Sequence, residues 1–163
     1  MNSKIYANRI IGNLYLSDYE AAINYDYIRG LNITHIVTIG RELTRPFEHI
    51  DYYYISLADH PDENISEHFE RVNEFILRNI TAGKNVLVHC RAGISRSATL
   101  VIAYLMSRFD MPLRFAFAYV RARRPQIRPN FGFVAQLQAY DKVLKKNRGG
   151  RAPLYRNCVI EAV

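Results

Sequence analysis

Residues 86–97 read VLVHCRAGISRS, a short apolar stretch followed by a polar loop. The opening residues are typical of a buried strand, and the glycine-free apolar run at 98–109 is typical of a buried helix. Between them, the backbone amides of 91–96 can surround a phosphate, because Gly93 allows the turn and the helix N-terminus adds positive potential. Arg96 brings a planar guanidinium that matches two phosphate oxygens. The pattern predicts a phosphate-binding loop between a strand and a helix.

Cys90 stands where the predicted strand meets this loop. The loop amides, the helix N-terminus and Arg96 favour the ionised form of a thiol, which is its nucleophilic form. Ser97 is expected to donate a hydrogen bond to the sulfur and so ease its departure as a leaving group. Neighbouring strand residues point to opposite faces, so we expect His89 to orient the loop and not to act as the general base. A cysteine with only a packing role is the alternative interpretation.

The segments around this loop alternate between patterns typical of strands and of helices. We expect strands at 8–16 as a hairpin around Gly12, at 33–39, at 52–57 and at 86–88. We expect helices at 17–29 with a Ser17/Glu20 capping box and a stop at Gly30, at 64–83 with an Asn64/Glu67 box and a stop at Gly83, and at 98–109, 112–125 and 133–144. This alternation predicts an α/β fold with a central, mostly parallel sheet and helices on both faces.

Length and composition indicate one domain. The chain has 163 residues, of which 49% are hydrophobic and 23% charged, which is enough for one core. No apolar stretch approaches the roughly 20 residues that span a bilayer, and the first residues lack the apolar core of a secretory leader. Because Cys90 and Cys158 make no disulfide framework, we expect free thiols and a cytoplasmic and/or nuclear location. We expect a folded domain over 1–146, a flexible tail over 147–163, and a monomer or weak dimer.

Positive charge gathers in the second half of the chain. The formal net charge is +7, while residues 108–151 hold 11 Lys and Arg against only Asp110 and Asp141. This imbalance favours anionic partners, and nucleic acid is the less favoured one because the segment carries no nucleic-acid-binding motif. Solvated helix faces are the simpler interpretation for about half of these side chains.

The segment HCRAGISRS resembles the Cys-x5-Arg phosphate loop of protein tyrosine phosphatases, and its interior resembles the dual-specificity, MAP-kinase-phosphatase-like branch. The resemblance runs from about residue 8 to 144 and includes RRPQIRPNFGFVAQLQAY at 123–140. It implies a three-layer α/β fold, a catalytic domain over 1–146 and a Cys90 nucleophile. It also implies that substrate phosphate is bound by Arg91, Ala92, Gly93, Ile94, Ser95 and Arg96. The histidines and cysteines show no metal-ligand spacing, so we expect neither a metal nor another cofactor.

A phosphate loop with a nucleophile also needs a proton donor for the leaving oxygen. The resemblance places this acid five residues before Asn64, at Asp59 in the segment LADHPDENIS, with Asp62 as the competitor. Both could instead be loop carboxylates beside a helix N-terminus. Asn130 is expected either to brace the acid loop, as its Pro-Asn context in the family suggests, or to cap a helix.

The resemblance implies hydrolysis of phosphotyrosine and phosphoserine/threonine through a phosphocysteine intermediate, with phosphorylated proteins, protein kinases among them, as substrates. We find no counterpart of the extra tyrosine-bearing loop that deepens the pocket of narrow phosphotyrosine enzymes. Two alternatives stay open: an RNA 5′-triphosphatase that uses the same loop, and a phosphopeptide-binding module without catalysis. Arg123, Arg124 and Arg128 are expected either to flank the pocket and favour acidic phosphopeptides, or to be solvated surface.

Overall fold

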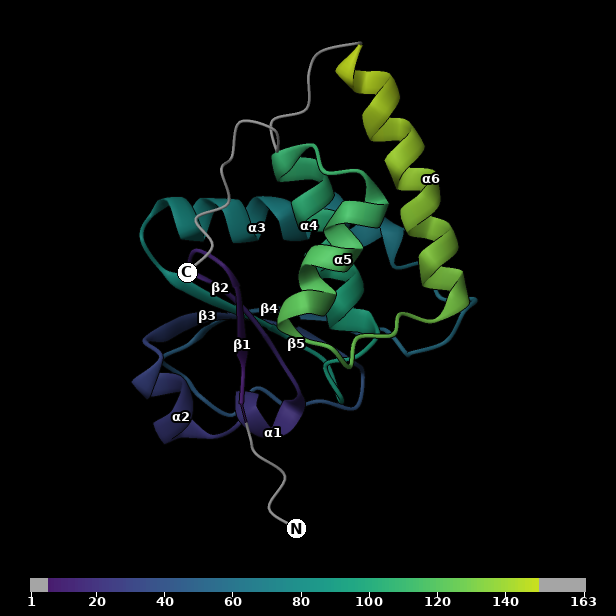
Figure 1. Ribbon diagram of the computed structural model, residues 1–163. Helices are drawn as coiled ribbons and strands as arrows, with labels where there is room; N and C mark the ends of the chain where they lie inside the picture. The colour runs from purple at the N-terminus through teal and green to yellow at the C-terminus, as the bar shows by residue number, and fades with distance from the viewer. Residues whose placement is uncertain (1–5, 150–163) are drawn as a thin grey trace.

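A computed structural model describes residues 6–149, and its centre is a five-stranded sheet (Figure 1). The strands lie in the order β1-β2-β5-β3-β4; β1 pairs with β2 antiparallel, and the other pairs are parallel. Their bounds are Asn8–Ile11 for β1, Leu14–Ser17 for β2, Ile33–Ile39 for β3, Asp51–Ile55 for β4 and Asn85–His89 for β5. The sheet is therefore mostly parallel, as predicted.

Helices cover both faces of this sheet. Figure 1 shows α1 (Tyr19–Ala22) and α2 (Tyr25–Gly30) on one side. On the other side lie α3 (Phe69–Thr81), preceded by the short 3-10 helix η1 (Ser66–His68), then α4 (Arg96–Phe109), α5 (Leu113–Arg123) and α6 (Phe131–Arg148). Within residues 6–149, no helix is both long and apolar enough to cross a membrane.

Two hydrophobic cores follow from the alternation of side chains along β5. Val86 and Val88 face the larger core under α3 to α6, while Leu87 faces the smaller core under α1 and α2. Helix α4 is buried without interruption from Arg96 to Met106, so it packs as the central helix of the larger core. Because β5 leads directly to α4, the intervening loop is held at the carboxyl edge of the parallel strands.

The predicted helix at 17–29 is in fact two short helices. Asp18, not Ser17, caps α1 through a 2.9 Å bond from the amide of Ala21, and Asn24 breaks the run and caps α2. Ser17 is unavailable as a cap because it pairs with β5 as the last residue of β2. Gly30 lies inside α2, and the left-handed residue that follows is Asn32, with φ 52°.

Three other boundaries differ from expectation. Asn64 and Glu67 bond to each other at 3.4 Å and precede η1, but they do not cap α3, which has no side-chain cap. Strand β4 ends at Ile55, so the residues after it belong to the loop of the predicted acid. Helix α6 runs from Phe131 through Arg148, so it begins before and ends after the helix predicted over 133–144. The rest of the predicted tail, with Cys158, lies outside the described residues.

Candidate active site

The loop between β5 and α4 has its carbonyl groups turned outward. The carbonyl of residue 91 accepts from the amide of Tyr19 at 3.1 Å, and that of residue 94 accepts from the amide of Arg128 at 2.8 Å. Those of residues 92 and 93 accept from the side chain of Arg124 at 3.3 and 2.7 Å. Within the described part of the chain, no amide of 91–95 donates to another protein group. These amides are therefore available to an anion, which is the arrangement of a phosphate loop.

Gly93 is required by the path of this loop. Its φ is +63°, and a Cβ there would lie 2.4 Å from the carbonyl oxygen of Ser17 and 2.6 Å from Nη2 of Arg124. Only glycine avoids both the backbone strain and these contacts. The loop therefore packs against β2 on one side and against Arg124 on another.

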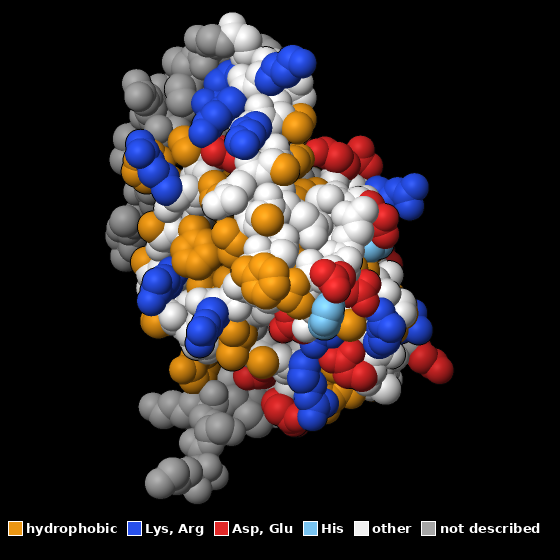
Figure 2. All heavy atoms as spheres, turned by 90° about the vertical axis from the view of Figure 1, so that its right-hand side faces the viewer, with side chains coloured by type: hydrophobic (Ala, Val, Ile, Leu, Met, Phe, Trp, Pro, Cys, Tyr) orange, Lys and Arg blue, Asp and Glu red, His pale blue; other side chains and the backbone are white. Residues whose placement is uncertain are grey.

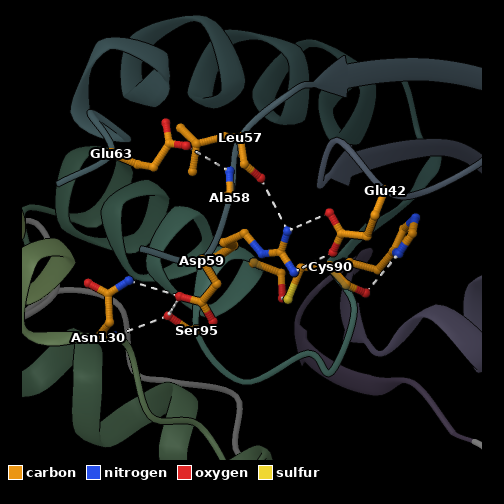
Figure 3. A network of polar contacts seen from close by, with 11 residues as sticks. Glu42, Leu57, Ala58, Asp59, Glu63, Cys90, Ser95 and Asn130 are labelled. Carbon is orange, nitrogen blue, oxygen red and sulfur yellow. Dashed lines mark hydrogen bonds and ion pairs between the residues drawn. The ribbon is translucent and has the colours of Figure 1, made fainter. Parts of the chain in front are cut away.

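Arg96 stands at the first turn of α4, and its guanidinium is fixed from outside the loop (Figure 3). Its Nη1 and Nη2 donate to the carboxylate of Glu42 at 3.1 and 2.8 Å, and Nη1 also donates to the carbonyl of Leu57 at 3.1 Å. Its Nε is buried and has no hydrogen-bond partner among residues 6–149. The free Nε and the remaining Nη2 hydrogen form two parallel donors, which suits two oxygens of one phosphate.

The ion pair also affects both protonation equilibria. The hydrogen bond from Arg96 lowers the pKa of Glu42 from its ordinary value, against the opposing effect of burial. Burial by itself would lower the pKa of Arg96, but the bond to Glu42 and the nearby charges of Cys90 and Asp59 raise it. Both groups are therefore charged at neutral pH.

Cys90 is buried, with 2% of its surface exposed, at the start of the loop. The hydroxyl of Ser97 donates a hydrogen bond to its sulfur at 3.1 Å. Cys90 directly follows β5 and Ser97 lies in the first turn of α4, so this contact joins the two ends of the loop. The geometry fits the expectation that Ser97 stabilises a negative sulfur.

His89 is buried against β3 and faces away from the loop interior. Its Nδ1 lies 3.2 Å from the carbonyl oxygen of Cys90, and its Nε2 lies 2.8 Å from the hydroxyl of Thr38. Because a carbonyl only accepts, Nδ1 carries the proton and Nε2 accepts from Thr38. Burial lowers the pKa of His89 to about 4, so the ring is neutral at physiological pH. This fits an orienting residue, which uses both ring nitrogens for structure.

Asp59 is joined to the loop and to α6 (Figure 3). Its Oδ1 accepts from the hydroxyl of Ser95 at 2.7 Å and from the side-chain amide of Asn130 at 2.8 Å. Asn130 also caps α6 by accepting from the amide of Phe133, so both predicted roles of this residue occur together. Asp62, in contrast, has a side chain that is 91% exposed and approaches only His60, at 3.7 Å. The geometry favours Asp59 as the acid.

The first turns of α6 hold the segment that follows Asp59. Gly132 packs so closely that a Cβ on it would lie 2.0 Å from the carbonyl oxygen of Pro61. Gln136 donates to the carbonyl of Glu63 and accepts from the amide of Ser66, both at 2.9 Å. The acid loop is therefore fixed along its length by a helix far away in the sequence.

A match to a family model identifies the protein family to which this site belongs. The model for the dual specificity phosphatase catalytic domain matches residues 14–143. The chain belongs to this family. The predicted membership and the predicted fold class are both confirmed, and the family is one of Cys-based protein phosphatases, with Cys90 in the buried site.

Relatives of this phosphatase domain differ widely in length. It is 44% identical over 144 residues to a probable rhodanese domain-containing dual specificity protein phosphatase of Dictyostelium discoideum, covering 87% of this chain but 30% of that protein. It is 42% identical to the human serine/threonine/tyrosine-interacting protein, covering 82% of this chain and 64% of that one. A crystal structure of that human protein superposes with a TM-score of 0.80 at 41% identity, over 84% of this chain and 96% of the other. A crystal structure of human DUSP28 superposes with a TM-score of 0.82 at 30% identity, over 85% and 95%.

Three residues of the phosphatase site were missed or misplaced by sequence reasoning. Glu42 and Gln136 carry no local motif, and the available signal was topological, because loops after parallel strands meet at one sheet edge. Arg124 was expected at the rim of the pocket or on the surface, but it is 1% exposed and lies behind the loop. Of the other two predicted rim residues, Arg128 is exposed beside the loop and Arg123 stacks over the ring of Tyr119 at 3.4 Å.

The basic half of the phosphatase domain is less available to anions than its charge suggests. Lys145 pairs with Asp141 at 2.6 Å, and Arg148 lies 3.8 Å from Asp110. Figure 2 shows Lys and Arg side chains over the upper end of the α6 face, with hydrophobic side chains exposed below them. No group of three potential metal ligands occurs within residues 6–149, and the absence of a cofactor stays a prediction.

Proposed function

We propose that this chain hydrolyses phosphotyrosine and phosphoserine/threonine in proteins through a phosphocysteine intermediate. The observation that carries the proposal is a loop of unpaired amides, closed by the free donors of Arg96, around the buried sulfur of Cys90. Its donors suit the equatorial oxygens of a transferring phosphoryl group, whose charge they would stabilise.

In the first step, the Cys90 thiolate attacks phosphorus in line with the leaving oxygen. The sulfur–phosphorus bond forms as the phosphorus–oxygen bond of the substrate breaks. Asp59 donates its proton to the leaving oxygen, which departs as a neutral hydroxyl. Oδ1 of Asp59 accepts both of its hydrogen bonds, so Oδ2 is the oxygen that carries the proton for the leaving group.

In the second step, the ionised Asp59 takes a proton from water as the water oxygen attacks phosphorus. The sulfur–phosphorus bond breaks, inorganic phosphate leaves, and Asp59 is protonated again. Ser97 donates its hydrogen bond to the departing thiolate, which supports this step more than the first.

The substrate class rests on the family, whose name describes its phosphatases as having dual specificity. Protein kinases phosphorylated on tyrosine and threonine are one group of proteins that fits. A cytoplasmic or nuclear location would keep the thiol of Cys90 reduced. The binding-module alternative fits the name of the serine/threonine/tyrosine-interacting protein, but the Cys90–Ser97 contact favours catalysis here. No observation favours the RNA 5′-triphosphatase.

The test compares phosphate release from a doubly phosphorylated peptide and from RNA with a 5′-triphosphate. We expect release from both phosphopeptide positions and none from RNA. Cys90→Ser should abolish turnover, and Asp59→Asn should lower kcat on the peptide by about 10²- to 10⁴-fold, the usual contribution of a general acid. Asp62→Asn is the matched control and should stay near the parent rate. A parent protein inactive on phosphopeptides, or an equal loss in Asp62→Asn, would contradict the proposal.

A further inference from the structure

Arg124 is a buried cation that the proposed reaction does not use. It follows α5 directly and is 1% exposed, the same degree of burial as the hydrophobic core. A buried charge is costly unless other groups compensate it, and a guanidinium stays protonated in proteins. Its position therefore calls for a functional or structural reason.

The contacts of Arg124 converge on the back of the phosphate loop. Nε donates to the carbonyl of Gly93 at 2.7 Å, and Nη2 donates to the carbonyl of Ala92 at 3.3 Å. Nη1 donates to the side chain of Asn8 on β1 at 2.8 Å, which fixes the plane of the guanidinium. Since the amide of the next residue is part of the same peptide plane as each carbonyl, turning these carbonyls outward turns the amides of 93 and 94 inward.

The charge of Arg124 is only partly compensated. Within the described residues, Asp18 is its one carboxylate partner, at a distance of 4.0 Å and with a side chain that is 30% exposed. Burial lowers the pKa of Arg124, and the charges of Asp18 and Cys90 oppose that effect. The other contacts are to neutral oxygens, so positive potential extends toward the loop interior.

We propose that Arg124 is a positioning residue that shapes the phosphate loop from behind. Its buried positive charge, together with that of Arg96, stabilises the Cys90 thiolate and bound phosphate. This inference builds on the proposed function, because it assigns a role to Arg124 within the same site. The charged groups around the loop are then the buried Arg96 and Arg124, the exposed Arg91 in the loop and Arg128 beside it, and Glu42, Asp59 and Asp18 at its edges, while His89 is neutral.

The test measures alkylation of Cys90 by iodoacetamide as a function of pH. Trypsin cleavage after Lys84 and Arg91 releases the Cys90 peptide, so Cys158 does not interfere. Arg124→Met removes the charge and both carbonyl contacts but keeps an apolar side chain in the buried space. We expect its alkylation midpoint to rise by about one pH unit, the smaller end of the usual effect of a nearby charge. We also expect inorganic phosphate to protect Cys90 at least about tenfold less well.

Arg121→Met is the matched control, because Arg121 is an exposed arginine on α5, and it should behave like the parent protein. Two milder variants decide the matter if Arg124→Met does not fold. Arg124→Lys keeps the charge without the planar fork, and Asn8→Ala removes the contact that orients the guanidinium. Both should leave the midpoint within a few tenths of a pH unit of the parent and weaken phosphate protection several-fold.

Two results would overturn the inference. One is an unchanged alkylation midpoint in folded Arg124→Met, and the other is full phosphate protection in Arg124→Lys and Asn8→Ala. Alkylation and protection require no turnover. A chain that hydrolyses no substrate would thus contradict the proposed function, while these measurements would still decide the role of Arg124.

Discussion

The neutral, buried His89 makes a specific prediction about how stability depends on pH. Burial lowers its pKa to about 4 in the folded protein, while an unfolded chain returns it to the ordinary value near 6.5. Between these two values, the unfolded state binds the proton and the folded state does not. The free energy of unfolding therefore falls as the pH drops from about 6.5 toward about 4, and it does not change above that window on account of His89.

The size of this effect follows from the two pKa values. The full difference corresponds to about 3 kcal/mol once both states are protonated, since one pH unit is worth about 1.4 kcal/mol. At about pH 5, the unfolded state is almost fully protonated and the folded state is hardly protonated, so about 2 kcal/mol of stability is lost. This is a large part of the total for a domain of this size.

The assay is urea unfolding of the parent protein and of His89→Gln at about pH 7.5 and about pH 5. Glutamine can still bond to Thr38 but does not take up a proton near neutral pH. The parent should lose about 2 kcal/mol more than the variant on acidification. Burial also lowers the pKa of His35, but His35 is present in both proteins and its effect cancels. Equal losses in the two proteins would show that His89 is not held neutral.

Three further predictions concern the reaction. Ser97→Ala loses the hydrogen bond to Cys90, so phosphocysteine should accumulate in rapid-quench experiments and kcat on an aryl phosphate should fall about tenfold or more. An unchanged second step would contradict this role. Gln136→Ala removes the contacts that hold the acid loop, so kcat on a phosphoserine peptide should fall at least about tenfold. The kcat on an activated aryl phosphate should hardly change, because its leaving group needs little protonation. Gln138→Ala, at an exposed position of the same helix, is the control. Dialysis against EDTA should leave the rate on either substrate unchanged, and a loss restored by a divalent cation would refute the metal-free mechanism.

The sequence alone indicated which residues lie together where these residues are close neighbours in the chain. Cys90 and Gly93 lie in one short loop after β5, and Arg96 and Ser97 lie in the first turn of the helix that follows, so their spacing alone brings them around the same point. The prediction that His89 faces away follows from the alternation of side chains along a strand. Asp59 needed the resemblance, because nothing in its own loop separates it from Asp62.

Local signals failed where tertiary pairing competed with them. Ser17 has the chemistry of a helix cap, but its pairing with His89 across β2 and β5 keeps it in the sheet, and Asp18 caps the helix instead. The helix expected over 17–29 divides because Asn24 offers a second cap. These outcomes depend on which strand lies next to β2, and no short stretch of sequence contains that information.

By itself, the amino-acid sequence determined the phosphate loop, its nucleophile and the alternation of strands and helices that makes the sheet parallel. Only the tertiary structure decided what holds the loop in its working shape: Glu42 on the outer edge of Arg96, Gln136 beneath the acid loop, and Arg124 behind the carbonyls of 92 and 93. Each of these side chains comes from a segment distant in the chain. The reason is that a buried polar group takes its partners from whatever packing brings near, and packing is a property of the whole fold.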